Sequence, residues 1–374
     1  MSYHGRFEQA KQPKQPGKKK GLKIFLIVIA VILVLLLIFA GAAYLYLQSK
    51  LKKMNIIELP KDTYAYTEPT DEVTRPPETG AETTEATTEA TVPKMTADDI
   101  VNILFVGQAA RAGEEETMAD STMLISINTY TKEITCMSIL RDSFVKLPDY
   151  KGHQCGRAKF TVCYNLGYQW GGGTAGGMEM TNICLKDNFG IEVDYNVEVS
   201  FDSFIKMIDY IDGVDIDLTQ AEADYLNKDT LYVKRTIEPG VQRLQGMEAL
   251  SYARMRKAAG DSESDIKRTE RQRKVVEALL EKFRYRSIAD LNKWIDILLP
   301  MVSTTMTPTD VTKLAARVLP IFSELKIKGA TVPMEGWGDM VDIYQDGQIH
   351  SVMRFDNAKE KKLIRAITEA EVSD

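Results

Sequence analysis

An almost unbroken apolar run from Ile24 to Leu47 constrains this chain more than any other feature. About 20 apolar residues suffice for a helix to cross a bilayer, whereas a cleaved signal peptide has a shorter apolar core that ends in small residues. Small residues occur at 41–43, but the apolar run continues through Tyr44 and Tyr46. The pattern therefore favours an uncleaved transmembrane anchor over a cleaved signal peptide.

Basic residues flank this run unequally. Lysines are dense in the residues before it, and fewer follow, at Lys50, Lys52 and Lys53. An excess of basic residues on one side predicts that this side stays in the cytoplasm. We therefore expect a single-pass protein of the cell membrane, with a basic cytoplasmic tail at 1–23, an anchor at 24–47 and the C-terminal part outside the cell.

The segment after the anchor has a different composition. Residues 62–95 are rich in Thr, Glu and Pro and have almost no large apolar side chains. Such a segment buries too little surface to offset the entropy of ordering it. We expect residues 48–96 to be an extracellular linker that holds a folded domain, residues 97–370, away from the membrane.

Hydrophobic patterning in the domain alternates between strands and helices. Residues 100–106 and 122–127 read as strands, and 133–140 returns as the hairpin partner of the second. Alternating strands and helices predict an α/β fold, here a three-layer α/β/α domain with a mixed central sheet. Further strands are expected at 193–199, 213–218, 327–332 and 341–344, and helices at 177–188, 201–211, 247–253, from 268 onward, 288–299, 308–324 and 357–367.

Arginines gather in the segment 240–273. A short helix delivers Arg254 and Arg256, an acidic loop follows, and a second helix carries Arg268, Arg271 and Gln272, which can share one helix face. Guanidinium groups stay charged and bind phosphate oxygens two at a time. The cluster suits a pyrophosphate or phosphodiester ligand, and the alternative is an ordinary solvated helix surface.

Net charge argues against one class of partner. The formal charge is −6, and because the N-terminal tail is basic, the exported part is more acidic than this value. A DNA-binding domain usually carries a basic stripe. We therefore expect no nucleic-acid partner.

Several segments resemble one known family when they are taken in order. They are 102–107 (NILFVG), 120–127 (DSTMLISI), 138–142 (SILRD), 213–215 (GVD), 240–256 and 265–272 (DIKRTERQ). The ordered set is similar to the LytR-CpsA-Psr family of membrane-anchored cell-wall enzymes. Members transfer glycopolymers, of the teichoic acid or capsule type, from a polyprenyl-pyrophosphate carrier to peptidoglycan and make a phosphodiester.

The resemblance implies roles for particular residues. Asp120 is expected to hold Mg²⁺, and Asp265 is the candidate for positioning or deprotonating the acceptor hydroxyl. An apolar cleft between the sheet and the helices is expected to take the first isoprene units of the carrier. The resemblance implies a pyrophosphate clamp made of Arg111, Arg141, Arg254, Arg256, Arg268 and Arg271, with Gln272 beside it.

This chain departs from the family pattern near the implied metal. Ala109 stands where the family has a second metal-binding aspartate, Met118 replaces an arginine and Thr161 an asparagine. We therefore expect weak Mg²⁺ binding. One of the residues Glu114–Glu116 could supply the missing carboxylate, but a solvated acidic run is the favoured interpretation of this segment. Three alternatives to a working transferase stay open: a weakened paralogue that binds lipid-linked polymer as a scaffold, a membrane-tethered regulator, or a polyprenyl-pyrophosphate hydrolase.

Cysteine and glycine patterns are less informative. Disulfides are permitted outside the membrane, and four cysteines allow three complete pairings between which the sequence does not choose. A bond between Cys155 and Cys163 is the pairing that we expect. Zinc is not expected, because no CxxC occurs and the histidines are scattered. The glycines at 171–173 lack a following GK[ST], so we expect a flexible loop beside the site instead of a phosphate cradle.

Overall fold

The structure is a computed structural model that describes residues 49–59, 96, 99–108, 119–256, 265–284, 288–334, 338–345 and 348–368. The chain divides into two units, residues 1–52 and 53–374. Apart from residues 49–52, all described residues belong to the second unit. The predicted anchor at 24–47 and most of the predicted linker lie outside the described residues. In the described part of the chain, no helix combines the length and the apolar character needed to span a bilayer.

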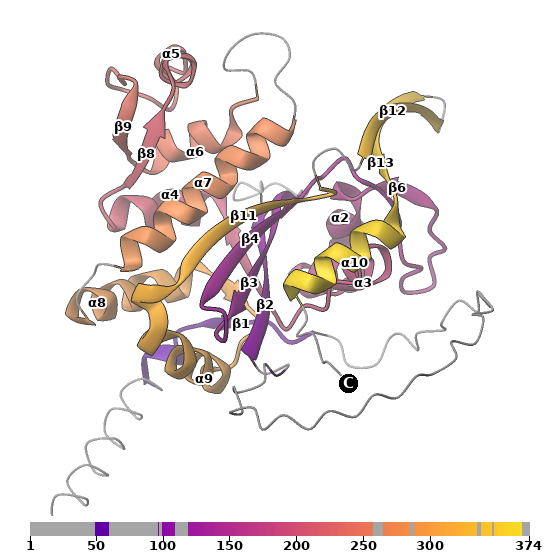
Figure 1. Ribbon diagram of the computed structural model, residues 1–374, viewed down its shortest axis with the longest axis horizontal. Coiled ribbons are helices and arrows are strands. Elements are labelled where there is room, and N and C mark those ends of the chain that lie inside the picture. Colours follow the sequence, from indigo (N-terminus) through magenta and orange to yellow (C-terminus); the bar gives the residue numbers. More distant parts are fainter. Residues whose placement is uncertain are drawn as a thin grey trace, which may run out of the picture. The chain divides into compact units, whose positions relative to one another are not determined.

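The centre of the second unit is a mixed sheet of seven strands in the order β1-β10-β7-β2-β3-β4-β11 (Figure 1). The β2–β3–β4 segment is antiparallel, as the hairpin prediction required, whereas β7 is parallel to β2 and β11 is parallel to β4. The predicted α/β class with a mixed sheet is therefore confirmed. The strands are β1 (Asn55–Ile56), β2 (Ile100–Gln108), β3 (Ala119–Asn128), β4 (Glu133–Ile139), β7 (Tyr195–Ser200), β10 (Ser303–Thr304) and β11 (Lys326–Val332).

Alternating side chains divide the sheet between two helical layers. Leu104, Val106 and Leu124 point into one core with α2 (Thr161–Gly171), α3 (Thr174–Phe189) and α10 (Asn357–Thr368). Met123 and Cys136, on the opposite face, belong to a second cluster that also takes in residues of α7 (Asp265–Arg284) and α9 (Pro308–Val318). The result is the predicted three-layer arrangement.

Beside α7 lies a third apolar cluster. It joins α7 to α4 (Phe201–Tyr210), α5 (Gln220–Lys228), α6 (Gly246–Arg254) and the hairpin of β8 (Val214–Leu218) with β9 (Gly240–Leu244). This cluster fixes where α4, α6 and α7 stand relative to one another. These three helices carry most of the candidate site.

Smaller elements complete the unit. The predicted helix at 308–324 ends as α-helix at Val318 and continues as a 3₁₀-helix, η3 (Leu319–Glu324), because Pro320 has no backbone N–H to extend the α-helix. The others are β5 (Phe144–Lys146) with β6 (Arg157–Lys159), α8 (Ile288–Leu298), η2 (Leu299–Met301) and the hairpin of β12 (Gly338–Gln345) with β13 (Gln348–Phe355).

The predicted disulfide is wrong. Cys136, Cys155, Cys163 and Cys184 are all free thiols. Cys163 is fully buried between α2 and α3, where its thiol donates to the Met180 carbonyl at 3.3 Å. Cys163 therefore contacts α3 and is not bonded to Cys155.

The glycines at 171–173 form the turn between α2 and α3, and they do not line the candidate site described below. Gly172 and Gly173 have φ of 82° and 94°, a left-handed backbone that favours glycine. The glycine run is therefore explained by a helix-to-helix turn, and the predicted flexible loop beside the site is wrong.

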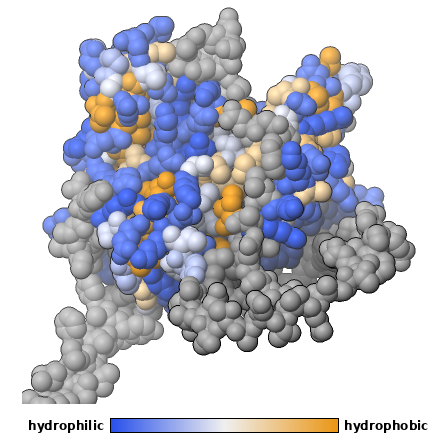
Figure 2. Space-filling model, in the orientation of Figure 1, coloured by the Kyte–Doolittle hydropathy of each residue, from blue (hydrophilic) through white to orange (hydrophobic). Residues whose placement is uncertain are grey.

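Hydrophilic residues cover most of the described surface on the face shown in Figure 2. Apolar residues form small patches there, including some on the β12–β13 hairpin, where Met340, Tyr344 and Ile349 are exposed. Scattered apolar residues of this kind are normal on a water-facing surface. The larger apolar areas face the two sides of the sheet and the cavity described next.

Candidate functional site

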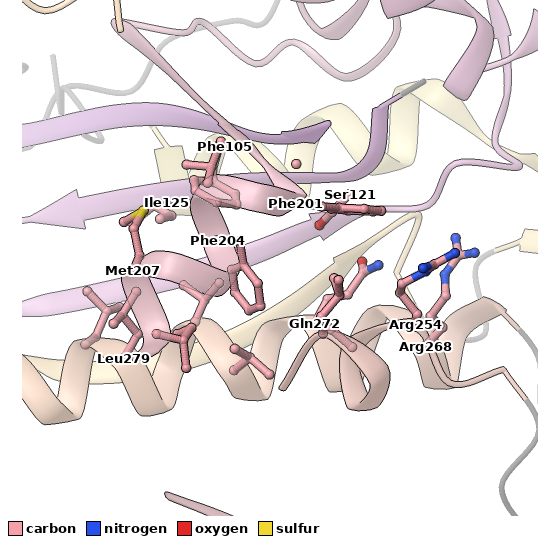
Figure 3. Close-up of a pocket in the computed structure, with 18 of the residues that line it drawn as sticks. Phe105, Ser121, Ile125, Phe201, Phe204, Met207, Arg254, Arg268, Gln272 and Leu279 are labelled. Atoms are coloured by element: carbon pink, nitrogen blue, oxygen red, sulfur yellow. The ribbon is translucent and has the colours of Figure 1, made fainter. Parts of the chain in front are cut away.

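A cavity of about 460 Å³ lies between strands β2 and β3 on one side and helices α4, α6 and α7 on the other (Figure 3). Its two ends differ in chemistry. One end is apolar, and the other carries the side chains of Arg254, Arg256, Arg268 and Gln272. The apolar lining consists of Phe105, Ile125, Val199, Phe201, Phe204, Met207, Ile208, Leu250, Ala253, Val275, Val276, Leu279 and Leu280.

Helix α7 runs along the whole cavity. Arg268, Gln272, Val275, Val276 and Leu279 line it, which is the spacing of one face of an α-helix. Polar residues come first on this face and apolar residues follow. Helix α7 therefore contributes side chains to both the polar and the apolar end.

The sheet contributes a narrow floor. Gly107, next to the β-bulge at the end of β2, and Ser121 of β3 both line the cavity. A Cβ at position 107 would lie 3.2 Å from the Ser121 Cβ, which is a tight contact. The glycine that ends the first predicted strand thus keeps the two strands close and the floor open.

Arg254 is the last residue of α6 and is exposed toward the cavity mouth. Its guanidinium lies over the Phe201 ring at 5.4 Å and over the Tyr232 ring at 6.0 Å, and it donates to the Tyr232 hydroxyl at 3.3 Å. Cation–π contacts of this kind restrict where a guanidinium can point. Arg256 follows two residues later and is also exposed.

Arg268 differs from these two because it is buried, with 4% of its surface exposed, although it lines the same cavity. Figure 3 shows Arg254 and Arg268 at the same end of the cavity, next to Gln272 and Ser121. Among the described lining residues there are three arginines and no carboxylate. The mouth therefore favours an anion, and the apolar end favours a hydrocarbon chain.

Arg271 lies outside this lining, contrary to the expectation that it shares a face with Arg268 and Gln272. Its Nε donates to Glu222 Oε1 at 2.9 Å and its Nη1 to the Met255 carbonyl at 3.1 Å. Both side chains of the Arg271–Glu222 pair are about 5% exposed. Arg271 therefore contacts α5 and the end of α6 instead of facing the cavity.

The backbones of Arg141 and Asp120 lie at the same end of the β3–β4 pair. The amide of Thr161 donates to the Arg141 carbonyl, and its hydroxyl donates to the Ala119 carbonyl at 3.4 Å. Asp120 stands between Ala119 and the cavity residue Ser121, but its side chain is outside what the structure describes. Arg141 is half-buried and pairs with Asp142 at 3.7 Å; it is not a lining residue.

The remaining predicted site residues are only partly described. Asp265 is the first residue of α7, with its side chain outside the description, and Arg111, Ala109 and Glu114–Glu116 lie outside the described residues altogether. Within the described residues, no group of three or more His, Cys, Asp or Glu side chains is arranged to hold a metal ion. The described donors alone thus do not make a magnesium site, and Asp120 keeps its assignment as a prediction.

Comparison with known proteins decides the family. The model of the LytR_cpsA_psr family matches residues 70–361, which is more than half of the chain. The chain belongs to the LytR-CpsA-Psr family. The regulatory protein MsrR of Staphylococcus aureus (strain COL) is 30% identical over 254 residues, covering 67% of this chain and 69% of MsrR.

Two further members of the LytR-CpsA-Psr family are similar to this chain. The polyisoprenyl-teichoic acid–peptidoglycan teichoic acid transferase TagU of Oceanobacillus iheyensis is 29% identical, covering 68% of this chain and 74% of TagU. A solved structure of YwtF (TagT) with bound octaprenyl pyrophosphate lipid matches with a TM-score of 0.52 and 20% identity, covering 74% of this chain and 94% of that one. At this identity the structural match shows a shared fold.

The sequence did not predict the residues that contact the site arginines from neighbouring elements. Tyr232 contacts the cavity residue Arg254, and Glu222 contacts Arg271. The sequence signal at Glu222 is a capping box with Thr219, which predicts a helix start and not a partner for Arg271. An apolar cleft between the sheet and the helices was expected from the family resemblance. Which of its side chains enter the cavity depended on tertiary packing.

Proposed function

We propose that this protein is a phosphotransferase that attaches a glycopolymer of the teichoic acid or capsule type to peptidoglycan from a polyprenyl-pyrophosphate carrier. The observation that carries the proposal is the cavity with an arginine-lined mouth and an apolar interior. A polyprenyl pyrophosphate has a charged head and a hydrocarbon tail that match these two ends. The name of TagU and the lipid bound to TagT support the same class of substrate.

The described residues suit the charge changes of the reaction. A sugar hydroxyl of the acceptor attacks the sugar-linked phosphorus, the P–O bond to polyprenyl phosphate breaks, and the leaving phosphate takes the electron pair. Arg254, Arg256 and Arg268 surround the mouth where this charge accumulates, and fixed cations at such a position stabilise the transition state. Gln272 supplies a neutral donor beside them.

Two roles in this proposal rest on the family resemblance. Asp265 accepts the proton of the attacking hydroxyl, and its place at the start of α7 puts its backbone near the cavity end of that helix. Asp120 binds Mg²⁺, which supplies additional positive charge when bound, and Ala109 leaves this binding weak. Arg141 acts from the Asp120 end of β3 and β4, and Arg111 joins the pyrophosphate contacts.

Location follows from the sequence. A membrane anchor at 24–47 and an extracellular linker at 48–96 keep the domain within reach of a carrier whose tail is in the same bilayer. This topology gives the domain access to both membrane lipid and peptidoglycan.

The proposal is tested with the full-length chain in detergent, an octaprenyl-pyrophosphate-linked sugar, and peptidoglycan as acceptor. We expect release of octaprenyl phosphate together with a labelled phosphodiester on peptidoglycan. Arg254→Ala is expected to reduce the rate by about 10²-fold or more, the usual cost of removing one fixed charge-stabilising donor. Arg243→Ala is the matched control, because Arg243 is half-exposed and pairs with Asp215 on the β8–β9 hairpin.

Each other outcome contradicts the proposed transfer in a defined way. Release that proceeds equally without peptidoglycan identifies a hydrolase. Arg254-dependent binding without release identifies a non-catalytic lipid-binding protein. Equal rates for Arg254→Ala and Arg243→Ala place the reaction outside this cavity.

A further inference from the structure

Glu222 joins three helices at a buried point behind the cavity. Its carboxylate accepts from the Thr219 amide at 3.0 Å within α5, from the Tyr252 hydroxyl of α6 at 3.4 Å, and from Arg271 Nε of α7 at 2.9 Å. Burial by itself raises the pKa of Glu222, but the hydrogen bonds from Thr219 and Arg271 outweigh it and hold the pKa below its ordinary value. Glu222 is therefore a charged partner for Arg271 at neutral pH.

Arg271 connects the buried Glu222 carboxylate to the backbone at the cavity mouth. While its Nε contacts Glu222, its Nη1 donates at 3.1 Å to the carbonyl of Met255. Met255 is fully buried and is the residue between Arg254 and Arg256. Helix α6 ends at Arg254, so the Met255 carbonyl is not held in a helix ladder. The guanidinium of Arg271 holds it instead.

The chain leaves helix α6 at this point, and the Met255 side chain is buried in the cluster that joins α6 to α7. The Met255 amide donates to the Tyr252 carbonyl at 3.2 Å, and φ and ψ of Met255 are −59° and 124°, which turns the chain away from the helix. A rotation of this one peptide would move the side chains of both Arg254 and Arg256. Binding sites of this kind tolerate displacements of only about 0.5 Å.

We propose that the buried Glu222–Arg271 pair is a positioning device that holds the Met255 peptide and thereby sets where Arg254 and Arg256 point. The proposal rests on the proposed function in one respect, that the two arginines bind a lipid pyrophosphate. It separates the arginines of this segment into two kinds. Arg254, Arg256 and Arg268 face the ligand, and Arg271 faces the protein.

The role of the Glu222–Arg271 pair in holding the Met255 peptide is tested without any ligand, by hydrogen–deuterium exchange on the full-length chain. Arg271→Lys keeps the charge that Glu222 needs, but one ammonium lacks the fork that reaches two partners at once. We expect exchange in residues 252–256 to rise about tenfold or more, which corresponds to losing one hydrogen bond to a charged group. Exchange in α2 and α3 stays unchanged. Unchanged exchange in 252–256 would overturn the proposal.

A second variant distinguishes loss of the positioning contact from general misfolding. Glu222→Gln combined with Arg271→Met removes both charges and keeps the side-chain volumes, and such replacements of buried ion pairs often leave stability unharmed. This double variant is expected to unfold cooperatively and still to show the faster exchange at 252–256. The matched control is Arg243→Met, which removes an exposed Arg–Asp pair elsewhere; it leaves exchange in this segment as in the wild type.

The consequence for the ligand is tested by calorimetry with octaprenyl pyrophosphate. Arg271→Lys is expected to weaken binding about tenfold, and in an Arg254→Ala background the same substitution costs less than about threefold, because coupled residues are non-additive. A loss of equal size in both backgrounds would mean that Arg271 does not act through Arg254. If the wild type binds no octaprenyl pyrophosphate, the proposed function fails, and the exchange experiment alone decides the positioning role.

Discussion

At the scale of single residues, Glu198 of β7 is a buried carboxylate that is not a cavity residue. It accepts from the Tyr164 hydroxyl and, at 3.2 Å, from the Thr174 hydroxyl, and it is 7% exposed. Burial raises the pKa of Glu198 above its ordinary value, although both hydrogen bonds oppose the shift. In the folded state the carboxylate charge is therefore unfavourable relative to the unfolded chain.

This shift predicts a pH-dependent effect of Glu198→Gln. A raised folded-state pKa gives stability that is fully present below the unfolded pKa, near 4.5, and is lost as pH rises through the folded pKa. Gln does not titrate, so the unfolding free energy of the variant should rise relative to that of the wild type between about pH 4 and pH 8. Urea unfolding at both pH values measures this, and a difference independent of pH would contradict it. All other carboxylates are present in both the wild type and the variant, so their contributions cancel in the difference between the two unfolding free energies.

The same scale shows what the sequence could and could not predict of the site. Arg254, Arg256, Arg268 and Gln272 were predicted, and all four line the cavity. Arg271 was predicted with them because it follows Arg268 by three residues, which is nearly one turn of an α-helix. At about 100° per residue, however, positions 271 and 272 lie on opposite sides of position 268. The packing of α7 against α6, β8 and the central sheet decides which side faces the cavity.

At the scale of elements, α2 and α3 pack backbone to backbone through glycines. A Cβ on Gly167 would collide with the Gly176 carbonyl, and a Cβ on Gly176 would collide with the Gly167 carbonyl. Glycine costs a helix about 1 kcal/mol relative to alanine, which is why the sequence pattern did not predict α2. The close contact of the two helices supplies the stability that local propensity lacks.

Gly167→Ala is therefore expected to destabilise the protein. Alanine gains about 1 kcal/mol in helix propensity, but the collision is with backbone that cannot rotate away, and overpacking of this kind costs about 1–3 kcal/mol or more. Because the collision is with rigid backbone, we take the upper end of this cost and expect a net loss of about 2 kcal/mol in the free energy of unfolding, measured in urea. Gly156→Ala is the matched control, because a Cβ there meets nothing within 4 Å and the change should be within about 0.5 kcal/mol. Equal effects of the two substitutions would show that the glycine contact is not tight.

At the scale of the whole molecule, the order of elements predicted the layers better than it predicted the sheet. The strands at 100–106, 122–127 and 133–140 pair as neighbours, because short connections favour antiparallel pairing of adjacent strands. The two-residue strands β1 and β10 join the sheet from distant parts of the chain. No pattern in so short a strand specifies its partner, so the β1 edge of the sheet could not be predicted.

The assembled layers also limit the ligand. The sheet, α4 and α7 line the cavity (Figure 3), and its volume of about 460 Å³ limits the length of hydrocarbon that it can hold. Burial contributes about 0.8 kcal/mol per CH₂, so each five-carbon unit that enters should raise affinity more than tenfold. We expect affinity to rise from inorganic pyrophosphate through geranyl and farnesyl pyrophosphate, and then to level off before octaprenyl pyrophosphate.

The point at which affinity levels off identifies the end of the cavity. Leu279→Trp, which fills the apolar end, should move this point to a shorter chain and leave the affinity for inorganic pyrophosphate as in the wild type, because the arginines lie at the opposite end. Calorimetry across the lipid series measures both quantities. If inorganic pyrophosphate binds as tightly as farnesyl pyrophosphate, the apolar end does not receive the tail; if Leu279→Trp weakens all ligands equally, the substitution has disturbed the whole cavity and the assignment of its two ends is wrong.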